Sequence, residues 1–252
     1  LVGSIDLLAV AGESGVLWSQ PGLGFAGRGE ALSVSVPRHD PSAAAEAVAA
    51  SLRSVDVVID EVDRPGSGPV ALGALPFDPR APGTLTIPEQ LVVVQSDEAW
   101  ITRISPDGAE PDPAMLTATT DVARSAPQAE GASGYRVTSD RDPAAWCDAL
   151  STARDELAAG RARKVVLARA ITIASEQPFS RHRVLESLAR AYPACMLFAD
   201  GPFVGASPEL LVARDRDTVH SQPMAGTAPR SNDPDEDARL AADLLASAKN
   251  RA

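Results

Sequence analysis

Short apolar runs, each closed by glycine, proline or aspartate, dominate residues 1–110 and restrict the fold more than any other feature of the chain. Runs of this length between turn-forming residues are typical of β-strands. We expect strands at Leu7–Val10, Leu32–Val36, Val55–Ile59, Val70–Leu75 and Leu91–Val94. One alanine-rich stretch breaks the pattern, and we expect Ser42 to cap a helix there. Residues 1–140 are therefore predicted to be strand-rich, with a surface connection over 105–135.

Helices become more frequent in residues 141–252. Asp142 and Pro143 occupy the cap and first position of a predicted helix that Gly160 ends, and Ser180 introduces another helix. We expect strands at Lys164–Ile173, Met196–Ala199 and Phe203–Ala206, followed by a hairpin of Leu210–Ala213 and Thr218–Ser221. Strands interleaved with a few helices, without strict βαβ alternation, indicate an α+β fold.

The last stretch of sequence has a clear helix start and no helix end. Asp233 is the expected N-cap, Pro234 suits the first helical position, and Glu236 completes a capping-box spacing. After Pro234 the sequence contains no glycine or proline that could end the helix. Its one asparagine there, Asn250, lies two residues before Ala252. We predict that the helix runs to the end of the sequence, and that residues 1–252 form a single α+β domain that is incomplete at its C-terminus.

Composition excludes several classes of partner and site. The 252 residues carry a net charge of −11 without a basic patch, which argues against a nucleic-acid or anionic-membrane surface. Two cysteines, Cys147 and Cys195, cannot form a disulfide framework or a zinc site by themselves. No apolar run is long enough to span a membrane and no signal peptide is visible, so we expect a cytoplasmic protein.

Lys164 begins the run KVVLARAITI, in which residues 164, 166, 168 and 170 would share one face of a strand. An amine among small apolar groups would be partly desolvated, which lowers its pKa and makes a neutral, basic amine accessible. A lysine at the end of a strand that extends into water fits the same residues. The pattern alone leaves both interpretations open.

Glu209 follows a proline that must interrupt its strand. Pro208 cannot donate a hydrogen bond to a sheet, so the strand should break or bulge there and turn the next carboxyl group out of register. Such a carboxyl group is a candidate general acid with a raised pKa. An exposed turn glutamate is the alternative.

The segment QPMAGTAPR has a composition suited to ligand contact. Gly226 allows close approach of the backbone to a ligand, and Thr227 offers a hydroxyl group beside it. Arg230 could bind an anion or pair with the acidic cluster that follows it. This segment has neither a GxGxxG nor a GxxxxGK[ST] spacing, so it gives no support to NAD or ATP binding, and the chain contains no HExxH or GxSxG motif that would support zinc-peptidase or serine-hydrolase chemistry.

Four segments in this order resemble the chorismate-utilising enzymes: ARKVVLARA, VGASPELLVAR, QPMAGTAPR and DEDARLAADLLASAKNR. This family includes isochorismate, salicylate, anthranilate and aminodeoxychorismate synthases. The resemblance covers residue 142 to the end most strongly, and GPVALGALPFDP with LTIPE extends it into the N-terminal part. It implies antiparallel sheets packed together with helices outside, and makes residues 141–252 the first part of the chorismate-binding core.

The resemblance also implies roles for single residues. Lys164 falls on the general base that activates water, and Glu209 on the general acid that protonates the departing hydroxyl group. Gly226 and Thr227 fall on the pocket for a substrate carboxylate, to which Ala225 and Ser207 are added as substrate-binding residues. The expected cofactor is Mg²⁺, with glutamate ligands of the family lying beyond Ala252 and none in this chain.

Isochorismate synthase is the expected subtype, with isochorismate used for menaquinone or for a catechol siderophore. Salicylate synthase and the aminating enzymes are the alternatives within the family, and Lys164 counts against amination because the water-using members carry this base. We expect chorismate as the substrate, a monomer, and activity only if the polypeptide continues past residue 252. The alternative of another class is an inactive fragment or interaction module that lacks the metal site.

Overall fold

The computed structural model describes residues 5–37, 40–56, 62, 64, 66–78, 80–105, 108–109, 134–224 and 226–247. By its internal contacts the chain divides into two compact units. Unit 1 consists of Leu1–Ala126 and Leu185–Ala252, and unit 2 of Pro127–Val184. The expected single domain with a change of character near residue 140 stays a prediction, and each unit is described by itself.

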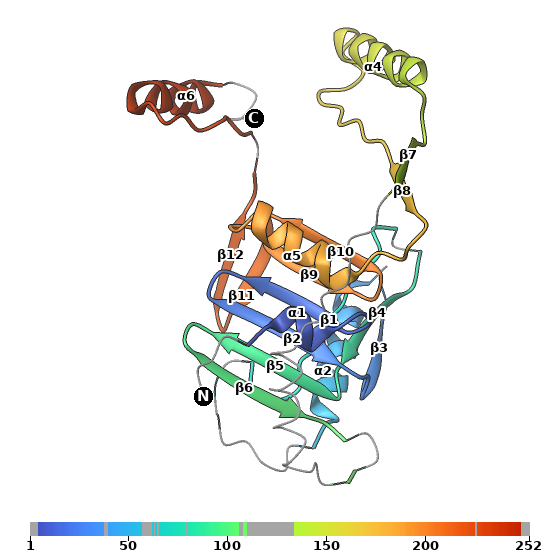
Figure 1. Ribbon diagram of the computed structural model, residues 1–252, viewed down its shortest axis with the longest axis vertical. Helices are drawn as coiled ribbons and strands as arrows, with labels where there is room; N and C mark the ends of the chain where they lie inside the picture. The colour runs from blue at the N-terminus through green and yellow to red at the C-terminus, as the bar shows by residue number, and fades with distance from the viewer. Residues whose placement is uncertain are drawn as a thin grey trace. The chain divides into compact units, whose positions relative to one another are not determined.

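A six-stranded antiparallel sheet forms the centre of unit 1, with the strand order β10-β9-β1-β2-β5-β6 (Figure 1). Its strands are β1 (Val16–Gln20), β2 (Leu23–Arg28), β5 (Gln90–Gln95), β6 (Glu98–Arg103), β9 (Met196–Asp200) and β10 (Phe203–Ser207). Strands from the two ends of the chain meet in the middle of this sheet, where β1 pairs with β9. The pair β9 and β10, which leads to Glu209, is therefore anchored to the N-terminal part of the chain.

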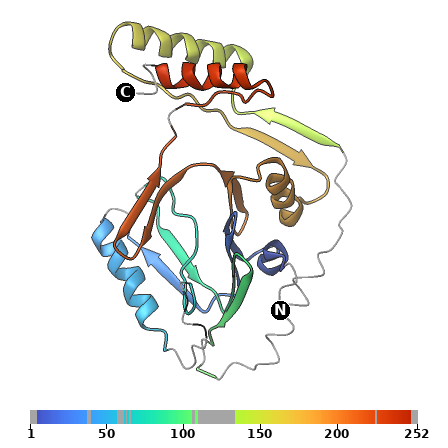
Figure 2. The ribbon, with the colours of Figure 1, turned by 90° about the vertical axis from the view of Figure 1, so that its left-hand side faces the viewer.

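Side chains alternate between the two faces along each strand, and apolar side chains of this sheet are buried on both faces. On one face, α1 (Leu7–Ala11) and residues 185–191 of α5 (Arg181–Ala191) lie side by side (Figure 2). They pack on a cluster of small and branched side chains, namely Leu17, Ala26, Val92, Leu197 and Ala199. On the other face, Leu91, Val93 and Trp100 form a second cluster. Strand β5 contributes to both clusters, which explains why its residues form a continuous apolar run.

In the described part of the chain, three two-stranded sheets account for the remaining strands. In unit 1, β3 (Leu32–Val36) pairs with β4 (Gly83–Ile87), and β11 (Leu210–Asp215) pairs with β12 (Thr218–Gln222). In unit 2, β7 (Tyr135–Ser139) pairs with β8 (Ile171–Ser175). Every pairing is antiparallel. The α+β fold built of antiparallel sheets is thereby confirmed.

Three of the described helices begin where aspartate is followed by proline. Asp142 caps α4 (Pro143–Ala158) in unit 2, and Asp233 caps α6 (Pro234–Ala246), both as predicted. The cap of α2 (Pro41–Arg53) is Asp40, whose carboxylate accepts hydrogen bonds from two backbone N–H groups, and the expected cap at Ser42 is wrong. Aspartate followed by proline at the first helical position places the cap two residues earlier, at Asp40.

Three predicted elements of unit 1 differ from the structure. Leu7–Val10 is helix α1 because the Asp6 carboxylate caps it, accepting from Leu8 and Ala9. Val70–Leu75 is not a strand, and its one bridge to a strand among the described residues joins Leu72 to Thr86. Helix α6 ends at Ala246, before the end of the sequence.

Two further predictions fall mainly outside the described residues: the strand at Val55–Ile59 and the connection over 105–135. The strands at Leu32–Val36 and Leu91–Val94, the strands before Glu209, the hairpin after it and the helix after Ser180 are confirmed within a residue or two. In the described part of the chain, no helix has the length and apolar character needed to cross a bilayer.

Candidate functional site

Glu209 stands at the strand break that Pro208 predicts. Strand β10 ends at Ser207 and β11 begins at Leu210, and the pairing of β11 with β12 shifts register between Leu210 and Ala213. The Ser207 hydroxyl group accepts a hydrogen bond from the Glu209 N–H at 3.2 Å and donates to the Glu209 carbonyl oxygen at 3.3 Å. The break is thus a compact turn that presents an exposed Glu209 side chain.

The Glu209 carboxyl group joins two of the sequence motifs. Its Oε1 accepts a hydrogen bond from the backbone N–H of Met224, at 3.1 Å. Met224 belongs to QPMAGTAPR, which follows β12, so the hairpin of β11 and β12 returns this segment to Glu209. A carboxyl group held by a fixed backbone donor is oriented before any ligand arrives.

The other end of the QPMAGTAPR segment is tied to α6. Arg230 donates from Nε and Nη2 to the two carboxylate oxygens of Asp237, each at 2.8 Å, and the Ser231 N–H donates to Oδ1 of Asp237 at 3.0 Å. The bond to Arg230, with the Ser231 N–H, holds the pKa of Asp237 below its ordinary value. The structure therefore favours the ion pair for Arg230 over anion binding.

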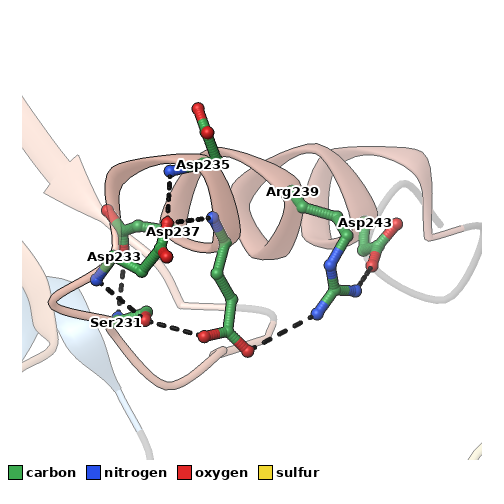
Figure 3. Close-up of polar contacts among 7 residues, drawn as sticks. Ser231, Asp233, Asp235, Asp237, Arg239 and Asp243 are labelled. Carbon is green, nitrogen blue, oxygen red and sulfur yellow. Dashed lines mark hydrogen bonds and ion pairs between the residues drawn. The ribbon is translucent and has the colours of Figure 1, made fainter.

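Hydrogen bonds around the start of α6 extend this arrangement (Figure 3). The Ser231 hydroxyl group donates to Glu236 at 2.9 Å and accepts from the Asp233 N–H at 3.2 Å. Glu236 therefore bonds to Ser231, two residues before the cap. In a capping box, Glu236 would instead accept from the N–H of Asp233. Here the Asp233 N–H donates to the Ser231 hydroxyl group.

Lys164 lies in unit 2, and the predicted strand at Lys164–Ile173 is wrong in its first seven residues. Strand β8 begins only at Ile171, because β7 pairs with residues 171–175, so Lys164 is not on a strand. Its side chain is exposed, and so is Val166, the next residue of the expected apolar face. Of the two interpretations that the sequence leaves open, the structure therefore favours the exposed lysine over the desolvated strand face.

The remaining predicted site residues belong to unit 1. Ser207 is half-buried and bonded to Glu209, whereas Gly226 and Thr227 are exposed between the two tethered ends of their segment. Ala225 lies outside the described residues. Glu209 and Ser207 are thus brought together with the segment of Gly226 and Thr227, and Lys164 stands in the other unit.

Two contributors to this arrangement have no obvious signal in the sequence. Met224 acts through its backbone N–H, which any residue except proline provides. Asp237 lies seven positions after Arg230, a spacing that only the start of α6 turns into a contact. Among the described residues, no group of three His, Cys, Asp or Glu side chains gathers to hold a metal ion, so these residues do not fit a Mg²⁺ site.

Comparison with known proteins places the chain among relatives. Residues 6–252 match the family model described as "Chorismate binding enzyme". The chain is 35% identical over 201 residues to the "Putative isochorismate synthase MenF" of Mycobacterium tuberculosis, covering 75% of this chain and 47% of that protein. It is 30% identical over 195 residues to "Isochorismate synthase DhbC" of Bacillus subtilis, covering 73% and 43%.

A solved structure shares the fold. The crystal structure of a "putative 2,3-dihydroxybenzoate-specific isochorismate synthase, DhbC" from Bacillus anthracis superposes with a TM-score of 0.66 at 23% identity. The superposition covers 97% of this chain and 57% of that one. The chain spans about half the length of the curated relatives it matches.

Proposed function

The chain belongs to the chorismate binding enzyme family, as its four motifs indicated, and from this premise we propose that it converts chorismate to isochorismate. The subtype is supported by relatives that bear the name isochorismate synthase and are 30% to 35% identical to this chain. The motif KVVLARA, with the lysine expected of a water-using enzyme, supports the same choice over amination.

The proposed reaction exchanges one hydroxyl position for another. Lys164, as a free amine, takes a proton from a water molecule while the water oxygen bonds to one ring carbon of chorismate. The ring double bonds shift, and the hydroxyl group on another ring carbon leaves with a proton from the Glu209 carboxyl group. One water molecule enters and one leaves, so the net change is an isomerisation.

The observation that carries this proposal is the hydrogen bond between Met224 and Glu209. It brings the proposed acid next to the segment of Gly226 and Thr227, which we propose to hold a substrate carboxylate. A general acid must lie within hydrogen-bond reach of the group it protonates, and the substrate must be bound beside it. Ser207 supports the same turn through its two bonds to Glu209.

We retain Mg²⁺ as the proposed cofactor, with its ligands outside the described residues. A divalent cation would supply positive charge for a dicarboxylate substrate, and no step assigned to Lys164 or Glu209 depends on its position.

The test is chorismate turnover in the presence of Mg²⁺, with products separated by chromatography. Isochorismate is expected, whereas salicylate, or anthranilate when ammonia is supplied, would instead support the corresponding family subtype. Lys164→Ala and Glu209→Gln should each lower kcat by about 10²- to 10⁴-fold, the usual contribution of a general acid or base. Arg163→Ala is the matched control for Lys164, since it removes the neighbouring exposed cation.

Turnover that survives Lys164→Ala would refute the assignment of the base. Absence of turnover at every Mg²⁺ concentration, with the wild-type protein folded, would refute the enzymatic proposal and favour the non-catalytic module.

A further inference from the structure

The segment from Met224 to Ser231 is held at both ends by carboxylates that lie outside it. At its start, the Met224 N–H donates to Glu209. At its end, Arg230 and the Ser231 N–H both donate to Asp237. Gly226 and Thr227, the proposed substrate contacts, lie between these two attachments.

Asp237 is the better anchored partner of the second attachment. Its side chain is 24% exposed, whereas that of Arg230 is 87% exposed. The two parallel N–H···O bonds from a guanidinium group fix direction as well as distance, because the fork matches the carboxylate geometry. The backbone donor at Ser231 adds a third contact that does not depend on a flexible side chain. Helix α6 therefore supplies a fixed point for the end of the segment.

We propose that Asp237 is a positioning residue that orders the segment 226–231, so that Gly226 and Thr227 are arranged to receive a substrate carboxylate. The last step rests on the proposed function. Asp237 itself does not touch the substrate in this proposal; it acts through Arg230 and Ser231. Glu236 assists from the same helical turn by accepting from the Ser231 hydroxyl group.

The first test needs no ligand. Asp237→Asn replaces the carboxylate that pairs with Arg230 by a neutral amide. Asp235→Asn is the matched control. Asp235 lies in the same helical turn and its carboxylate is exposed. Only its backbone N–H takes part in the cap, and the substitution keeps that group. In hydrogen exchange of the full chain, amides of residues 226–231 should exchange several-fold faster in Asp237→Asn than in Asp235→Asn. Equal exchange in the two variants would overturn the proposal.

The second test measures chorismate binding. An exposed ion pair has a modest effect, so the Kd for chorismate should rise about fivefold in Asp237→Asn and stay unchanged in Asp235→Asn. If Asp237 acts through the segment, its effect should shrink in a Thr227→Val background, where the contact that it positions is already lost. Independent effects of Asp237→Asn and Thr227→Val would overturn the positioning role.

The two tests separate this proposal from the proposed function. Wild-type protein that fails to bind chorismate would refute the proposed function and, with it, the role of Asp237 in substrate positioning. The exchange experiment would still decide whether Asp237 orders the segment. Chorismate binding that is unaffected by Asp237→Asn would refute the inference alone.

Discussion

Gly205 in β10 is a position where a single methyl group should disturb the strand that leads to Glu209. It pairs with Phe198 of β9. A Cβ atom on Gly205 would lie 3.0 Å from Cε1 and Cε2 of the Phe198 ring and still closer to Cζ. That ring already contacts Phe203, with ring centroids 5.3 Å apart. In Gly205→Ala the ring must move, and overpacking of this kind costs about 1–3 kcal/mol of unfolding free energy.

Urea denaturation followed by tryptophan fluorescence measures this cost, because Trp18 of β1 stands opposite Phe198 in the same sheet. With an m-value of about 2 kcal/mol/M, the midpoint should fall by roughly 0.5–1.5 M. Phe198→Leu shortens the obstructing side chain, so in that background Gly205→Ala should cost less than about 0.5 kcal/mol. Additive effects of the two substitutions would refute the steric reasoning.

Three further perturbations test the core, the Asp237 ion pair and the proposed metal. Leu185 is 1% exposed, so Leu185→Ala should lower the free energy of unfolding by about 2–5 kcal/mol. Leu245 is 77% exposed, so Leu245→Ala should change it by less than about 0.5 kcal/mol. Similar urea midpoints for the two variants would contradict the core described above. Because Arg230 lowers the pKa of Asp237, their ion pair contributes at pH values above the ordinary carboxyl pKa and is lost as the pH falls through the lowered value. The Ser231 amide resonance should follow this titration with a midpoint below that of an ordinary aspartate, and a midpoint at or above the ordinary value would contradict it. EDTA should abolish chorismate turnover and added Mg²⁺ should restore it, while turnover that persists in EDTA would remove Mg²⁺ from the proposal.

The predictions that succeeded rest on local chemistry. Asp142 with Pro143, and Asp233 with Pro234, define helix starts through bonds between residues two or three positions apart. Pro208 predicts a strand break because it lacks an N–H group, and the turn at Ser207 and Glu209 lies there. Such signals act within a few residues, so they can be interpreted before any tertiary structure is known.

The predictions that failed depend either on a cap next to the segment or on a strand partner elsewhere in the chain. The apolar residues Leu7–Val10 suit either a strand or a short helix, and the Asp6 cap decides for the helix. Lys164 to Ala170 has the alternation of a strand, but β7 pairs only with Ile171–Ser175. A strand needs a neighbour as well as a pattern, and the sequence of one segment does not say how far its neighbour extends.

The same distinction applies to the proposed acid and base. The orientation of Glu209 is fixed by nearby residues, since Ser207 shapes its turn and Met224 binds its carboxyl group. Desolvation of Lys164 is a different kind of property, because it depends on what covers the side chain, and Lys164 is exposed in unit 2. An amine that removes a proton from water at neutral pH must lose part of its hydration or meet another positive charge. If Lys164 is the base, these conditions must arise when the substrate binds. We therefore expect its reactivity toward an amine-modifying reagent to change when chorismate binds. Labelling that is identical with and without bound chorismate would argue that Lys164 does not face the substrate.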